Sequence, residues 1–481
     1  MNANKFPRVQ FESSSAHLLP NRMSRRAFMC TAAASVGALA LESIALPAMA
    51  ARGGGGGGTV TRYPLHVPPT VSPGGFTLTA APAIVNLASP ESPSLSSALA
   101  YNGFLPGPTF RANKGDSVYV SFANGLADET TVHWHGMLVA TVQDGQPQDL
   151  VAPGGSRVYQ YPIVQRAALN WYHPHPHMMT GEQVCLGLAG AFIVNDAEEA
   201  ALGLPAFPYE VPLVVRDANF DKAGNLIYNP RTTGFDGNTP LVNGTRKPYL
   251  DVERSVYRFR VLNGANARLF RLVLGNGMPF TVIGNDGGLL AAPVNVTEIE
   301  FSPGERLDLL VNFQGLPGAR VMLHDLNSGW DLLEFRVANS TQVTGTMPTG
   351  TLSTIAPLPT PALTRYFSFD GMSKINGREY DSDRIDFQVP FGQTELWRFT
   401  TNGNAPHPVH IHGASFQVQS RTGGRGKLFP WESGWKDTVL LQDQETVEVL
   451  IRFDQYRGRY LIHCHKLEHE DMGMMANFQV I

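Results

Sequence analysis

Short runs of alternating apolar and polar residues recur along this chain, and several of them end at an Asn-Gly pair. Val118–Phe122 is followed by Asn124-Gly125, and Tyr257–Val261 is followed by Asn263-Gly264. Residues two positions apart lie on the same face of a β-strand, so the alternation predicts strands with one buried face. Asn and Gly tolerate the positive φ of tight turns, so each pair predicts a turn at the end of its strand.

An alternating run between two Asn-Gly pairs occurs three times in the sequence. The copies begin at Asn102-Gly103, Asn243-Gly244 and Asn376-Gly377, which are 141 and 133 residues apart. In the third copy, Leu396–Phe399 precedes Asn402-Gly403. Spacings of this length match whole β-sandwich domains and are too long for solenoid repeats. We therefore predict an all-β chain of three related Greek-key sandwiches.

Changes in composition suggest where these domains meet. An Ala/Glu stretch at 196–200 and a Pro-rich stretch at 357–361 are typical of domain joints. We place domain 1 at 60–197, domain 2 at 198–355 and domain 3 at 356–481. The whole chain of 481 residues has 48 Gly and 35 Pro and is only 16% charged, which indicates an ordered and turn-rich protein.

The charge of the chain is close to balanced. The net charge is −4, and the sequence contains no long run of Lys and Arg. A protein that binds nucleic acid normally carries a basic patch, so nucleic acid is not an expected partner.

The first fifty residues predict a twin-arginine signal peptide, the type that the Tat export machinery recognises. Arg25-Arg26 precede an apolar run, which ends in the small-x-small cleavage pattern Ala48-Met49-Ala50. A membrane anchor is the alternative, but Glu42 and Pro47 interrupt the run before it reaches the roughly 20 apolar residues that a span needs. We expect a signal peptide at 1–50, no stable anchor after cleavage, and a periplasmic or secreted protein.

The mature chain would begin with a Gly-rich stretch at 51–59, which predicts a flexible linker. Without residues 1–50 the chain keeps 32 basic and 39 acidic residues, a net charge of −7. It also keeps two cysteines, Cys185 and Cys464, in very different contexts. They do not form the disulfide framework of a small secreted domain, and we expect Cys185 to be a small buried apolar residue.

Most of the fourteen histidines fall into four short clusters with histidines at alternate positions. His133-Trp134-His135-Gly136 lies in domain 1 and His410-Ile411-His412-Gly413 in domain 3, whereas the matching stretch of domain 2, Phe280–Gly284, contains no histidine. In a strand, His-x-His directs two imidazoles towards one site. The clusters therefore predict metal sites, although imidazole alone suits copper, zinc, iron and nickel.

The fourth cluster narrows the choice of metal. His463-Cys464-His465 is followed by His469, and Met474 lies ten residues after the cysteine. One cysteine with two histidines and a weak axial methionine is the ligand set of a blue-copper site. Cys464 points to one face of its strand and its two neighbours to the other, so the cysteine can bind one copper while the neighbours bind others. The three residues would then form a short covalent path for electrons.

Taken in order, the four clusters resemble the copper motifs of the multicopper oxidases, and the similarity covers most of the mature chain. The second cluster is Trp171–His175, and the third extends back to His407. The segments Pro106–Pro108, Gly434–Thr438 and Leu467–Asp471 are most similar to the bacterial branch, with its laccases, cuprous oxidases and bilirubin oxidases. Four motifs in order are highly specific. The resemblance implies cupredoxin-like sandwiches and four copper ions per chain.

The resemblance also implies a place for each ligand. It assigns a type 1 copper to His407, Cys464, His469 and Met474. It assigns a type 2 copper to His133 and His410. It assigns the type 3 pair to the six histidines His135, His173, His175, His412, His463 and His465. Since these residues come from domains 1 and 3, we expect the trinuclear cluster at the interface of those domains, with domain 2 as a spacer.

Two of these assignments have alternatives. His177 continues the alternation of the second cluster, which makes the register ambiguous, and the family match selects the two earlier histidines. The other reading of His177 is a surface group or a group that supports a ligand. Met472 and Met475 compete with Met474, which only the ten-residue spacing of the family selects.

The activity that the resemblance implies is that of a laccase-like oxidase. Phenols, aromatic amines or low-valent metal ions would each give one electron to the type 1 copper, and the electrons would pass through Cys464 to the cluster. There dioxygen would take four electrons and become water, a reduction that also consumes four protons. Asp144 and Glu470 stand where the family has its proton donors, and the alternative is that both orient ligand imidazoles.

Three other functions are alternatives to this one. Periplasmic cuprous oxidases, which serve copper tolerance, carry a long Met- and His-rich insert before the Lys374–Gly377 turn, and here Phe367–Met372 runs straight into that turn. They also place an acidic residue shortly before the first type 1 histidine, and 402–406 contains none. Both differences favour organic donors. A copper nitrite reductase lacks the type 3 histidines, and a copper-binding scaffold without turnover requires missing ligands or a covered type 1 face. We expect a monomer.

Overall fold

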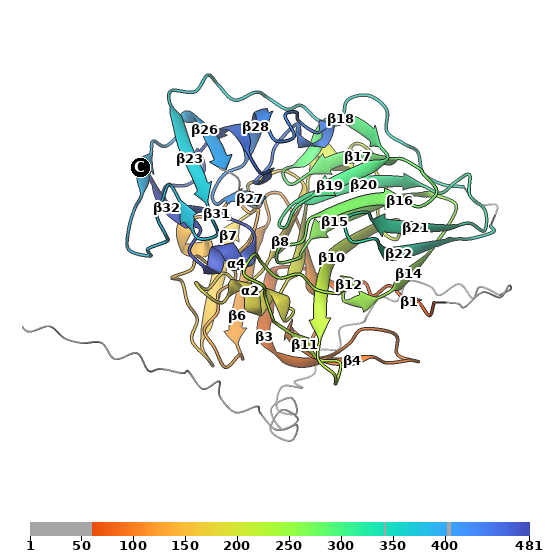
Figure 1. Cartoon of the computed structure of the whole chain (residues 1–481). Helices are drawn as coiled ribbons and strands as arrows, with labels where there is room; N and C mark the ends of the chain where they lie inside the picture. Colours follow the sequence, from red (N-terminus) through yellow and green to blue (C-terminus); the bar gives the residue numbers. More distant parts are fainter. Residues whose placement is uncertain (1–59, 341–342, 402–405) are drawn as a thin grey trace, which may run out of the picture. The chain divides into compact units, whose positions relative to one another are not determined.

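The computed structural model describes residues 60–340, 343–401 and 406–481. The predicted signal peptide, the Gly-rich linker and the Asn402-Gly403 turn lie outside the described residues. All described residues belong to one compact unit, Glu42–Ile481. Its regular structure is mostly β-strand, arranged in six sheets, and this confirms the predicted all-β class (Figure 1).

The first third of the chain forms a sandwich of two four-stranded sheets, β2-β5-β9-β8 and β4-β3-β6-β7. Its strands are β2 (Thr70–Val71), β3 (Gly74–Asn86), β4 (Leu95–Tyr101), β5 (Gly107–Asn113), β6 (Ser117–Asn124), β7 (Ser156–Pro162), β8 (Ala168–Tyr172) and β9 (Gly190–Asn195). The helical turns η1 (Thr141–Gln143) and α2 (Thr180–Cys185) lie between strands. In β6 the apolar residues Val118, Val120 and Phe122 are buried, as the alternation predicts, because they face the core between the sheets.

The middle third forms a second sandwich, with the sheets β1-β14-β22-β21-β16-β19 and β13-β12-β10-β15-β20-β17-β18, and with β11 beside β10. Its elements are β1 (Tyr63–Pro64), α3 (Ala197–Ala200), β10 (Glu210–Phe220), β11 (Leu226–Ile227), β12 (Thr239–Val242), β13 (Thr245–Arg246), β14 (Pro248–Val252), β15 (Val256–Asn263), β16 (Phe270–Leu274), β17 (Phe280–Asn285), β18 (Gly288–Val296), β19 (Glu298–Phe301), β20 (Arg306–Asn312), β21 (Arg320–Asp325) and β22 (Trp330–Val337). Strand β1 pairs in parallel with β14, so the start of the described chain joins this sandwich.

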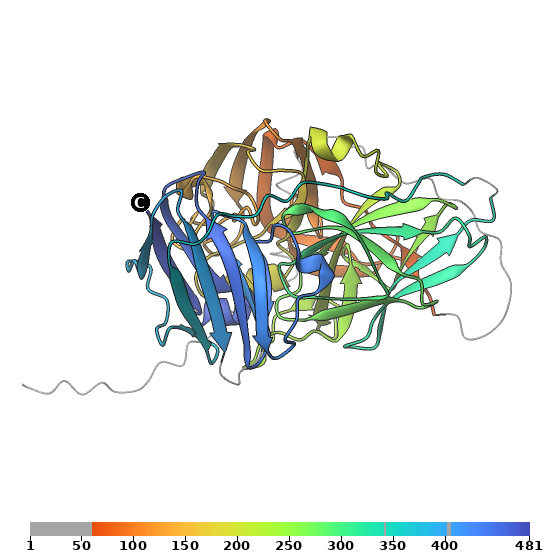
Figure 2. The same ribbon diagram turned by 90° about the horizontal axis from the view of Figure 1, so that it is seen from above.

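The last third forms a sandwich of two five-stranded sheets, β24-β23-β26-β30-β28 and β25-β32-β31-β27-β29. Its elements are β23 (Thr364–Asp370), β24 (Lys374–Ile375), β25 (Phe387–Val389), β26 (Thr394–Thr401), β27 (His407–Ile411), β28 (Phe416–Gly423), η2 (Pro430–Glu432), β29 (Thr438–Leu441), β30 (Glu445–Arg452), β31 (Gly458–Cys464), α4 (Leu467–Asp471) and β32 (Met475–Val480). Figure 2 shows the three groups of strands in orange, green and blue. We keep the names domain 1, domain 2 and domain 3 for the three sandwiches.

The Asn-Gly turns divide into two kinds. At the first pair of each copy, φ is positive at both residues: 52° and 79° at Asn102-Gly103, 48° and 72° at Asn243-Gly244, and 53° and 73° at Asn376-Gly377. These pairs confirm the predicted tight turns.

The prediction is wrong for the second pairs, Asn124-Gly125 and Asn263-Gly264, where φ is not positive. Asn124 is buried, and its amide donates to the carbonyls of Asp128 and Val151 while its oxygen accepts from Leu126 N. Asn263 makes the equivalent bonds in domain 2. At both positions the asparagine side chain closes a loop by hydrogen bonds.

The alternation in β15 predicts one buried and one exposed face, but both faces are buried. Arg258 and Arg260 take its polar positions, yet both are buried. Arg258 pairs with Asp308 and Glu199, and Arg260 pairs with Glu199 and Glu210. Buried charges require such partners, so this face of the strand is covered by an ion-pair network.

The sandwiches contact one another through apolar and polar surfaces. Leu169, Trp171 and Ile193 of domain 1 pack with Val214 and Leu262 of domain 2 in one buried cluster. Helices α2 and α4 lie side by side in Figure 1. There the carboxylate of Asp471 accepts from the backbone N–H groups of Thr180 and Gly181 at 2.9 and 2.8 Å. These contacts fix domains 1 and 3 against each other close to the histidine clusters.

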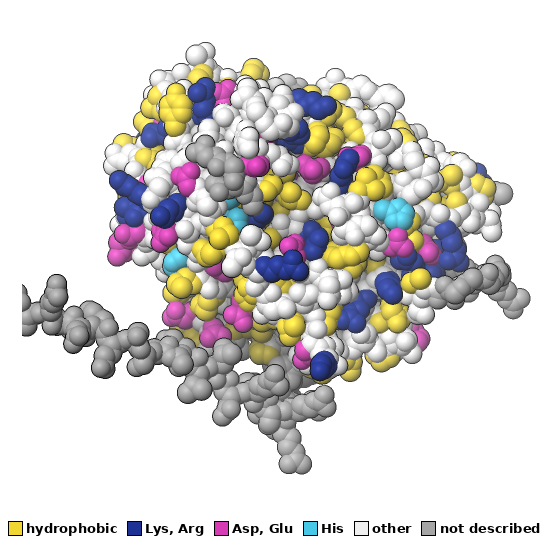
Figure 3. All heavy atoms as spheres, in the orientation of Figure 1, with side chains coloured by type: hydrophobic (Ala, Val, Ile, Leu, Met, Phe, Trp, Pro, Cys, Tyr) yellow, Lys and Arg dark blue, Asp and Glu magenta, His cyan; other side chains and the backbone are white. Residues whose placement is uncertain are grey.

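Two observations concern the surface. On the face that Figure 3 shows, acidic and basic side chains are interspersed with apolar and uncharged ones. Among the helices of the described residues, none combines the length and the apolar character that a membrane span requires.

Candidate metal centres

The first candidate centre lies inside domain 3 and brings together His407, Cys464 and His469, from β27, β31 and α4. All three are fully buried. Cys464 Sγ lies 3.5 Å from His407 Nδ1 and 3.6 Å from His469 Nδ1, and the two nitrogens are 3.2 Å apart. A point equidistant from the three atoms lies about 2 Å from each, which is the length of a metal bond to nitrogen. The three residues therefore fit a single small cation.

Met474 belongs to the same part of the core as Cys464. Its carbonyl accepts from Cys464 N at 3.1 Å, and its own N–H donates to the His469 carbonyl at 2.9 Å. The backbone of Met474 is thus tied to two of the three residues of the centre. Of its rivals, Met472 is 40% exposed, and Met475 lies in β32 opposite His463. This environment favours Met474 over Met472 and Met475 as the fourth ligand of the first centre.

The second candidate centre lies between domains 1 and 3 and gathers the eight remaining predicted ligands: His133, His135, His173, His175, His410, His412, His463 and His465. Each of them is at most 2% exposed. In domain 1, His133 forms a β-bridge with His173. In domain 3, His410 on β27 lies opposite His463 on β31. Backbone pairing therefore places four of the histidines, whereas His135, His175, His412 and His465 lie outside the strands, and the domain interface brings the two halves together.

Three of these histidines point lone pairs at one another. His412 Nδ1 donates to Asp144 Oδ2 at 2.8 Å, and His463 Nδ1 donates to the Cys464 carbonyl at 3.1 Å. With the proton on Nδ1, each Nε2 carries a lone pair, yet the two Nε2 atoms are 3.1 Å apart. His175 Nε2 lies 3.4 Å from His463 Nε2. Lone pairs this close require a cation between them, so the residues fit a metal.

The hydrogen bonds of the other histidines also leave ring nitrogens available for a metal. Nδ1 donates to a backbone carbonyl in His133, His173 and His410, at 2.8 to 2.9 Å, and the Nε2 of each has no hydrogen-bond partner among the described residues. His135 is reversed, because its Nε2 faces Asp437 Oδ1 at 3.1 Å and its Nδ1 has no partner. In His465 neither ring nitrogen has one. A buried polar atom without a partner is costly, and a bound metal removes that cost.

Asp144 and Glu470 both lie against this cluster. The Oδ1 of Asp144 is 3.3 Å from His133 Nδ1, while its Oδ2 accepts from His412. The carboxylate of Glu470 is 3.0 Å from His175 Nδ1 and 3.3 Å from His463 Nδ1. Each carboxylate thus lies between two histidines, in position to orient them.

Sequence reasoning missed Asp437 and Arg306. Asp437 contacts two histidines, through its carboxylate to His135 and through its carbonyl to His410. Arg306, from domain 2, donates to both carboxylate oxygens of Asp437. The sequence contained one signal, because Asp437 lies in the segment Gly434–Thr438 that carries part of the family resemblance. It contained none for Arg306.

His177 and Cys185 lie outside both centres. The ring of His177 is half-buried and packs on Tyr380, with ring centroids 5.1 Å apart. No group of potential metal ligands among the described residues includes His177. Cys185 is buried and free, and burial raises the pKa of its thiol. These observations agree with the ordinary roles expected for both residues.

Burial lowers the pKa of His407, His469 and His410 in the metal-free protein. The pKa falls from 6.5 to about 3 in His407 and His469, with Lys466 among the further causes, and to about 4 in His410. Burial also raises the pKa of the Cys464 thiol to about 12. The imidazoles are therefore neutral and ready to bind a metal, whereas the thiol must give up its proton when the metal binds.

We expect the metal-free protein to lose stability as the pH falls from about 6.5 towards 4. Below pH 6.5 these histidines take up protons in the unfolded chain but not in the folded chain. Protonation therefore stabilises the unfolded state relative to the folded state. At pH 5.5 each such histidine lowers the free energy of unfolding by about 1.4 kcal/mol. The melting temperature at pH 7.5 and 5.5 measures the effect. A His407→Gln variant should show a smaller decrease, and an equal decrease would contradict the argument.

Two neighbouring spaces with shared lining residues lie beside the second centre. A void of about 10 Å³ is bordered by His133, His410 and His412. A cavity of about 390 Å³ borders Trp435 and Arg166. The two share five lining residues, which are Gly136, Leu138, Gly413, Ala414 and Ser415. The glycines that follow the two His-x-His pairs therefore line both spaces beside the cluster.

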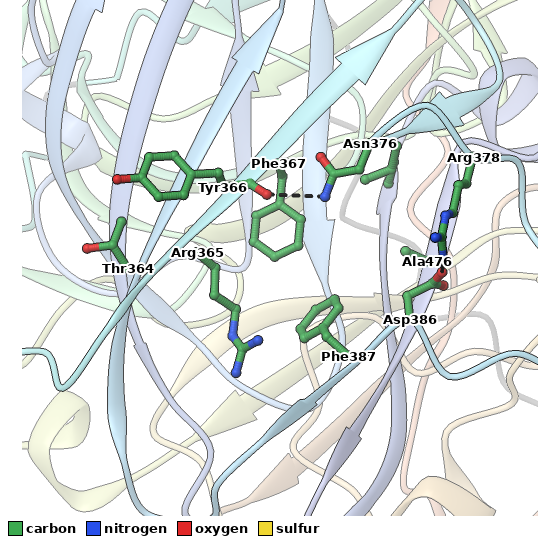
Figure 4. A pocket seen from close by; sticks show the side chains of 10 residues that line it. Thr364, Arg365, Tyr366, Phe367, Asn376, Arg378, Asp386, Phe387 and Ala476 are labelled. Atoms are coloured by element: carbon green, nitrogen blue, oxygen red, sulfur yellow. Dashed lines mark hydrogen bonds and ion pairs between the residues drawn. The ribbon is translucent and has the colours of Figure 1, made fainter.

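Another cavity, of about 460 Å³, opens on domain 3 between β23 and β25 (Figure 4). The rings of Phe367 and Phe387 line it, 5.4 Å apart, beside the guanidinium groups of Arg365 and Arg378. None of the predicted metal ligands is among its lining residues. This cavity is separate from both candidate centres.

Comparison with known proteins identifies the family. Multicopper oxidase models match residues 86–199, 215–352 and 354–481. The multicopper oxidase mco of Staphylococcus haemolyticus is 33% identical over 396 residues, 80% of this chain and 85% of that protein. The laccase of Bacillus subtilis is 32% identical over 459 residues, 79% of this chain and 89% of that protein.

Solved structures agree with these matches. A laccase from Pediococcus acidilactici superposes with a TM-score of 0.82 at 33% identity, over 88% of this chain and 94% of that one. This similarity confirms three cupredoxin-like sandwiches. With three matched segments, a complete set of candidate ligands and relatives of similar length, the chain belongs to the multicopper oxidases, copper-dependent oxidoreductases that use dioxygen as the electron acceptor.

Proposed function

We propose that this protein is a laccase-like oxidase, which takes single electrons from phenols and aromatic amines and reduces dioxygen to water. One observation carries the proposal: Cys464 belongs to the first candidate centre, and its neighbours His463 and His465 belong to the second. One strand end therefore joins a site with one cysteine to a cluster of eight histidines. Such an arrangement suits an enzyme that collects electrons at one place and uses them at another.

The donor groups support a specific distribution of four copper ions. Type 1 copper is assigned to His407, Cys464, His469 and Met474, and type 2 copper to His133 and His410. One type 3 copper is assigned to His175, His412 and His463, whose Nε2 atoms converge. The other is assigned to His135, His173 and His465, whose ring centroids are 4.9 to 5.7 Å apart.

Bound copper supplies the one-electron acceptor of the first centre and the site of dioxygen reduction in the second. The protein holds six of these imidazoles in one tautomer through an acceptor at the other nitrogen: His133, His135, His173, His410, His412 and His463. Asp144 accepts the Nδ1 proton of His412, and the carboxylate of Glu470 lies 3.0 Å from His175 Nδ1; we assign the supply of protons for water formation to these two carboxylates. Burial keeps bulk water away from every ligand.

The proposed donors rest on the surroundings of the first centre and on the relatives. Strands β23 and β24 are joined by only Gly371–Ser373, so the place of the cuprous-oxidase insert is a tight connection. Two relatives of similar length, from Bacillus subtilis and Pediococcus acidilactici, are named laccases. A metal-ion oxidase for copper tolerance is the second candidate. A copper-binding scaffold is disfavoured, because none of the assigned ligands is missing.

We also propose export through the Tat system to the periplasm or the exterior, as a monomer. The twin arginines and the cleavage pattern at residue 50 support this location. It agrees with a protein that keeps two unpaired cysteines and needs copper.

Dioxygen uptake by the copper-loaded mature protein tests the proposal. The protein would receive a phenol, an aromatic amine or Cu(I) in separate runs. Uptake of one dioxygen for every four donor electrons, fastest with the phenol, is the expected result. Uptake with Cu(I) alone would establish the metal-ion oxidase instead. Absence of uptake by fully loaded protein would refute an enzymatic role.

We expect a Leu138→Trp variant to react more slowly with dioxygen. Leu138 lines both spaces beside the second centre, so a larger side chain narrows the space next to the cluster. The KM for dioxygen should rise several-fold, while anaerobic reduction of the type 1 copper by the phenol keeps its rate. A Phe387→Trp change in the separate cavity is the control. An unchanged KM would show that dioxygen reaches the cluster another way.

A further inference from the structure

Arg306 of domain 2 lies where the three sandwiches meet, and it is fully buried. Its Nε donates to the Leu169 carbonyl of domain 1 at 3.0 Å. Its other donors reach the carbonyls of Gly304 and Asp286 in its own domain, at 2.8 and 3.2 Å. The remaining two bind both oxygens of Asp437 in domain 3, with Nη1 2.7 Å from Oδ1. All five N–H groups of the guanidinium therefore have an acceptor.

Asp437 connects Arg306 to the histidine cluster. Its Oδ1 lies 3.1 Å from His135 Nε2 and accepts from Thr438 Oγ1 at 2.9 Å. Arg306 binds both of its oxygens, and such a bidentate pair favours the charged carboxylate. The carboxylate is thus a fixed acceptor for the Nε2 proton of His135, which leaves Nδ1 with the lone pair.

This fixed acceptor matters because His135 is reversed relative to its neighbours. The assigned type 3 histidines His173 and His412 keep Nδ1 protonated and present Nε2. His135 presents Nδ1, and rotation of its ring by half a turn would exchange the two nitrogens. An anionic acceptor on one side selects one orientation and one tautomer.

Arg306 also controls what Asp437 itself can bind. The ligand atoms of His135, His410 and Asp437 lie close enough together to hold a metal ion. A carboxylate in that place competes with imidazole for copper unless its oxygens are occupied. The guanidinium binds both oxygens as a bidentate pair, a geometry that arginine and carboxylate groups favour.

Two further features support the same contact. Gly136 follows His135, and a Cβ there would lie 2.7 Å from Arg306 Nη2 and 3.0 Å from Asp437 Oδ2, so the absence of a side chain lets the ion pair approach. Lys436, next to Asp437, pairs with Asp286 and Glu305 of domain 2 at 2.8 and 3.0 Å. Domain 2 therefore holds this segment through two adjacent residues.

We propose that Arg306 is a positioning residue of the trinuclear cluster: it holds Asp437 as the hydrogen-bond acceptor of His135 and keeps that carboxylate from becoming a copper ligand. The inference rests on the proposed copper assignment. It gives domain 2, which provides none of the assigned ligands, a direct part in building the cluster.

Arg306→Met and Arg306→Lys variants of the full chain test this role. Copper per chain, the EPR signals of type 1 and type 2 copper and the near-ultraviolet absorption of the coupled type 3 pair are measured, together with melting of the copper-free protein. Loss of a residue that orients a ligand typically weakens metal binding about 10- to 100-fold. We expect that loss at the cluster for Arg306→Met, a smaller loss for Arg306→Lys, and an unchanged type 1 signal in both.

Arg258→Met is the matched control, because Arg258 is also buried in domain 2 and pairs with Asp308 and Glu199 away from the histidines. It should lower the melting temperature but leave every copper signal unchanged. If Arg306→Met does not fold, the Asp437→Asn variant tests the inference instead. In that variant Arg306 keeps Asp286 as a counter-ion. A normal cluster signal in a folded variant overturns the inference alone. Absence of type 1 and cluster signals in the unmodified protein overturns the proposed function.

Discussion

A Cys464→Ser variant is expected to lose oxidase activity almost completely while its histidine cluster still binds copper. Serine replaces one atom in a buried core, so the fold should persist. The hydroxyl does not ionise in this environment as a thiolate does when a soft metal binds, and the blue-copper ligand set loses its strongest donor. Dioxygen uptake with a phenol should fall at least about a thousandfold, which corresponds to roughly 4 kcal/mol in activation free energy.

The measurement combines dioxygen uptake with spectroscopy of the type 1 and type 2 copper. Cys185→Ser is the matched control, because Cys185 is also buried and free but belongs to no candidate centre. It should keep its activity and all copper signals. Activity of Cys464→Ser near that of the unmodified protein would refute the assignment of the first centre.

An Asp144→Ala variant is expected to show the next largest effect. Its carboxylate accepts the Nδ1 proton of His412 at 2.8 Å and lies 3.3 Å from His133 Nδ1. Without it, His412 has no acceptor to fix its ring, whereas His133 keeps the backbone carbonyl of residue 144 at 2.9 Å. Copper affinity at the cluster should fall about 10- to 100-fold, and turnover with it.

The Asp144→Asn variant separates two roles of this residue. An amide oxygen still accepts from His412, so copper binding should fall less than in Asp144→Ala. If the carboxylate also supplies protons, turnover of the copper-loaded Asn variant should fall with little copper loss and depend more steeply on pH. Asp149→Ala, in the same loop, is the control. Unchanged copper affinity in Asp144→Ala would contradict the orienting role.

The fold class and the histidine clusters could be predicted because both depend on local patterns. Alternation along a strand shows in a few consecutive residues, and the buried Val118, Val120 and Phe122 follow it. His-x-His shows the same local rule, since two imidazoles from one strand end need no distant partner to point together. The positive φ of the first Asn-Gly pairs is likewise local.

The features that were missed depend on contacts between distant segments. Arg306 and Asp437 are 131 positions apart, and although Asp437 lies in a segment that carries family resemblance, nothing in the sequence indicates that the two residues pair. Asn124 and Asn263 were interpreted as turn residues, because a sequence does not reveal that the amide points inward to a loop. Arg258 and Arg260 looked like an exposed face, since their acidic partners lie on other elements.

The division of the trinuclear histidines between the two ends of the chain has a consequence for biosynthesis. His133 and His463 are 330 positions apart, and the intervening middle sandwich must take its place before they meet. A nascent chain that lacks domain 3 has half of the imidazoles of the cluster and no cysteine centre. Contacts of such long range form late and slowly during folding. Copper uptake by the cluster is therefore expected to follow completion of synthesis, so that partly made chains do not carry a redox-active site.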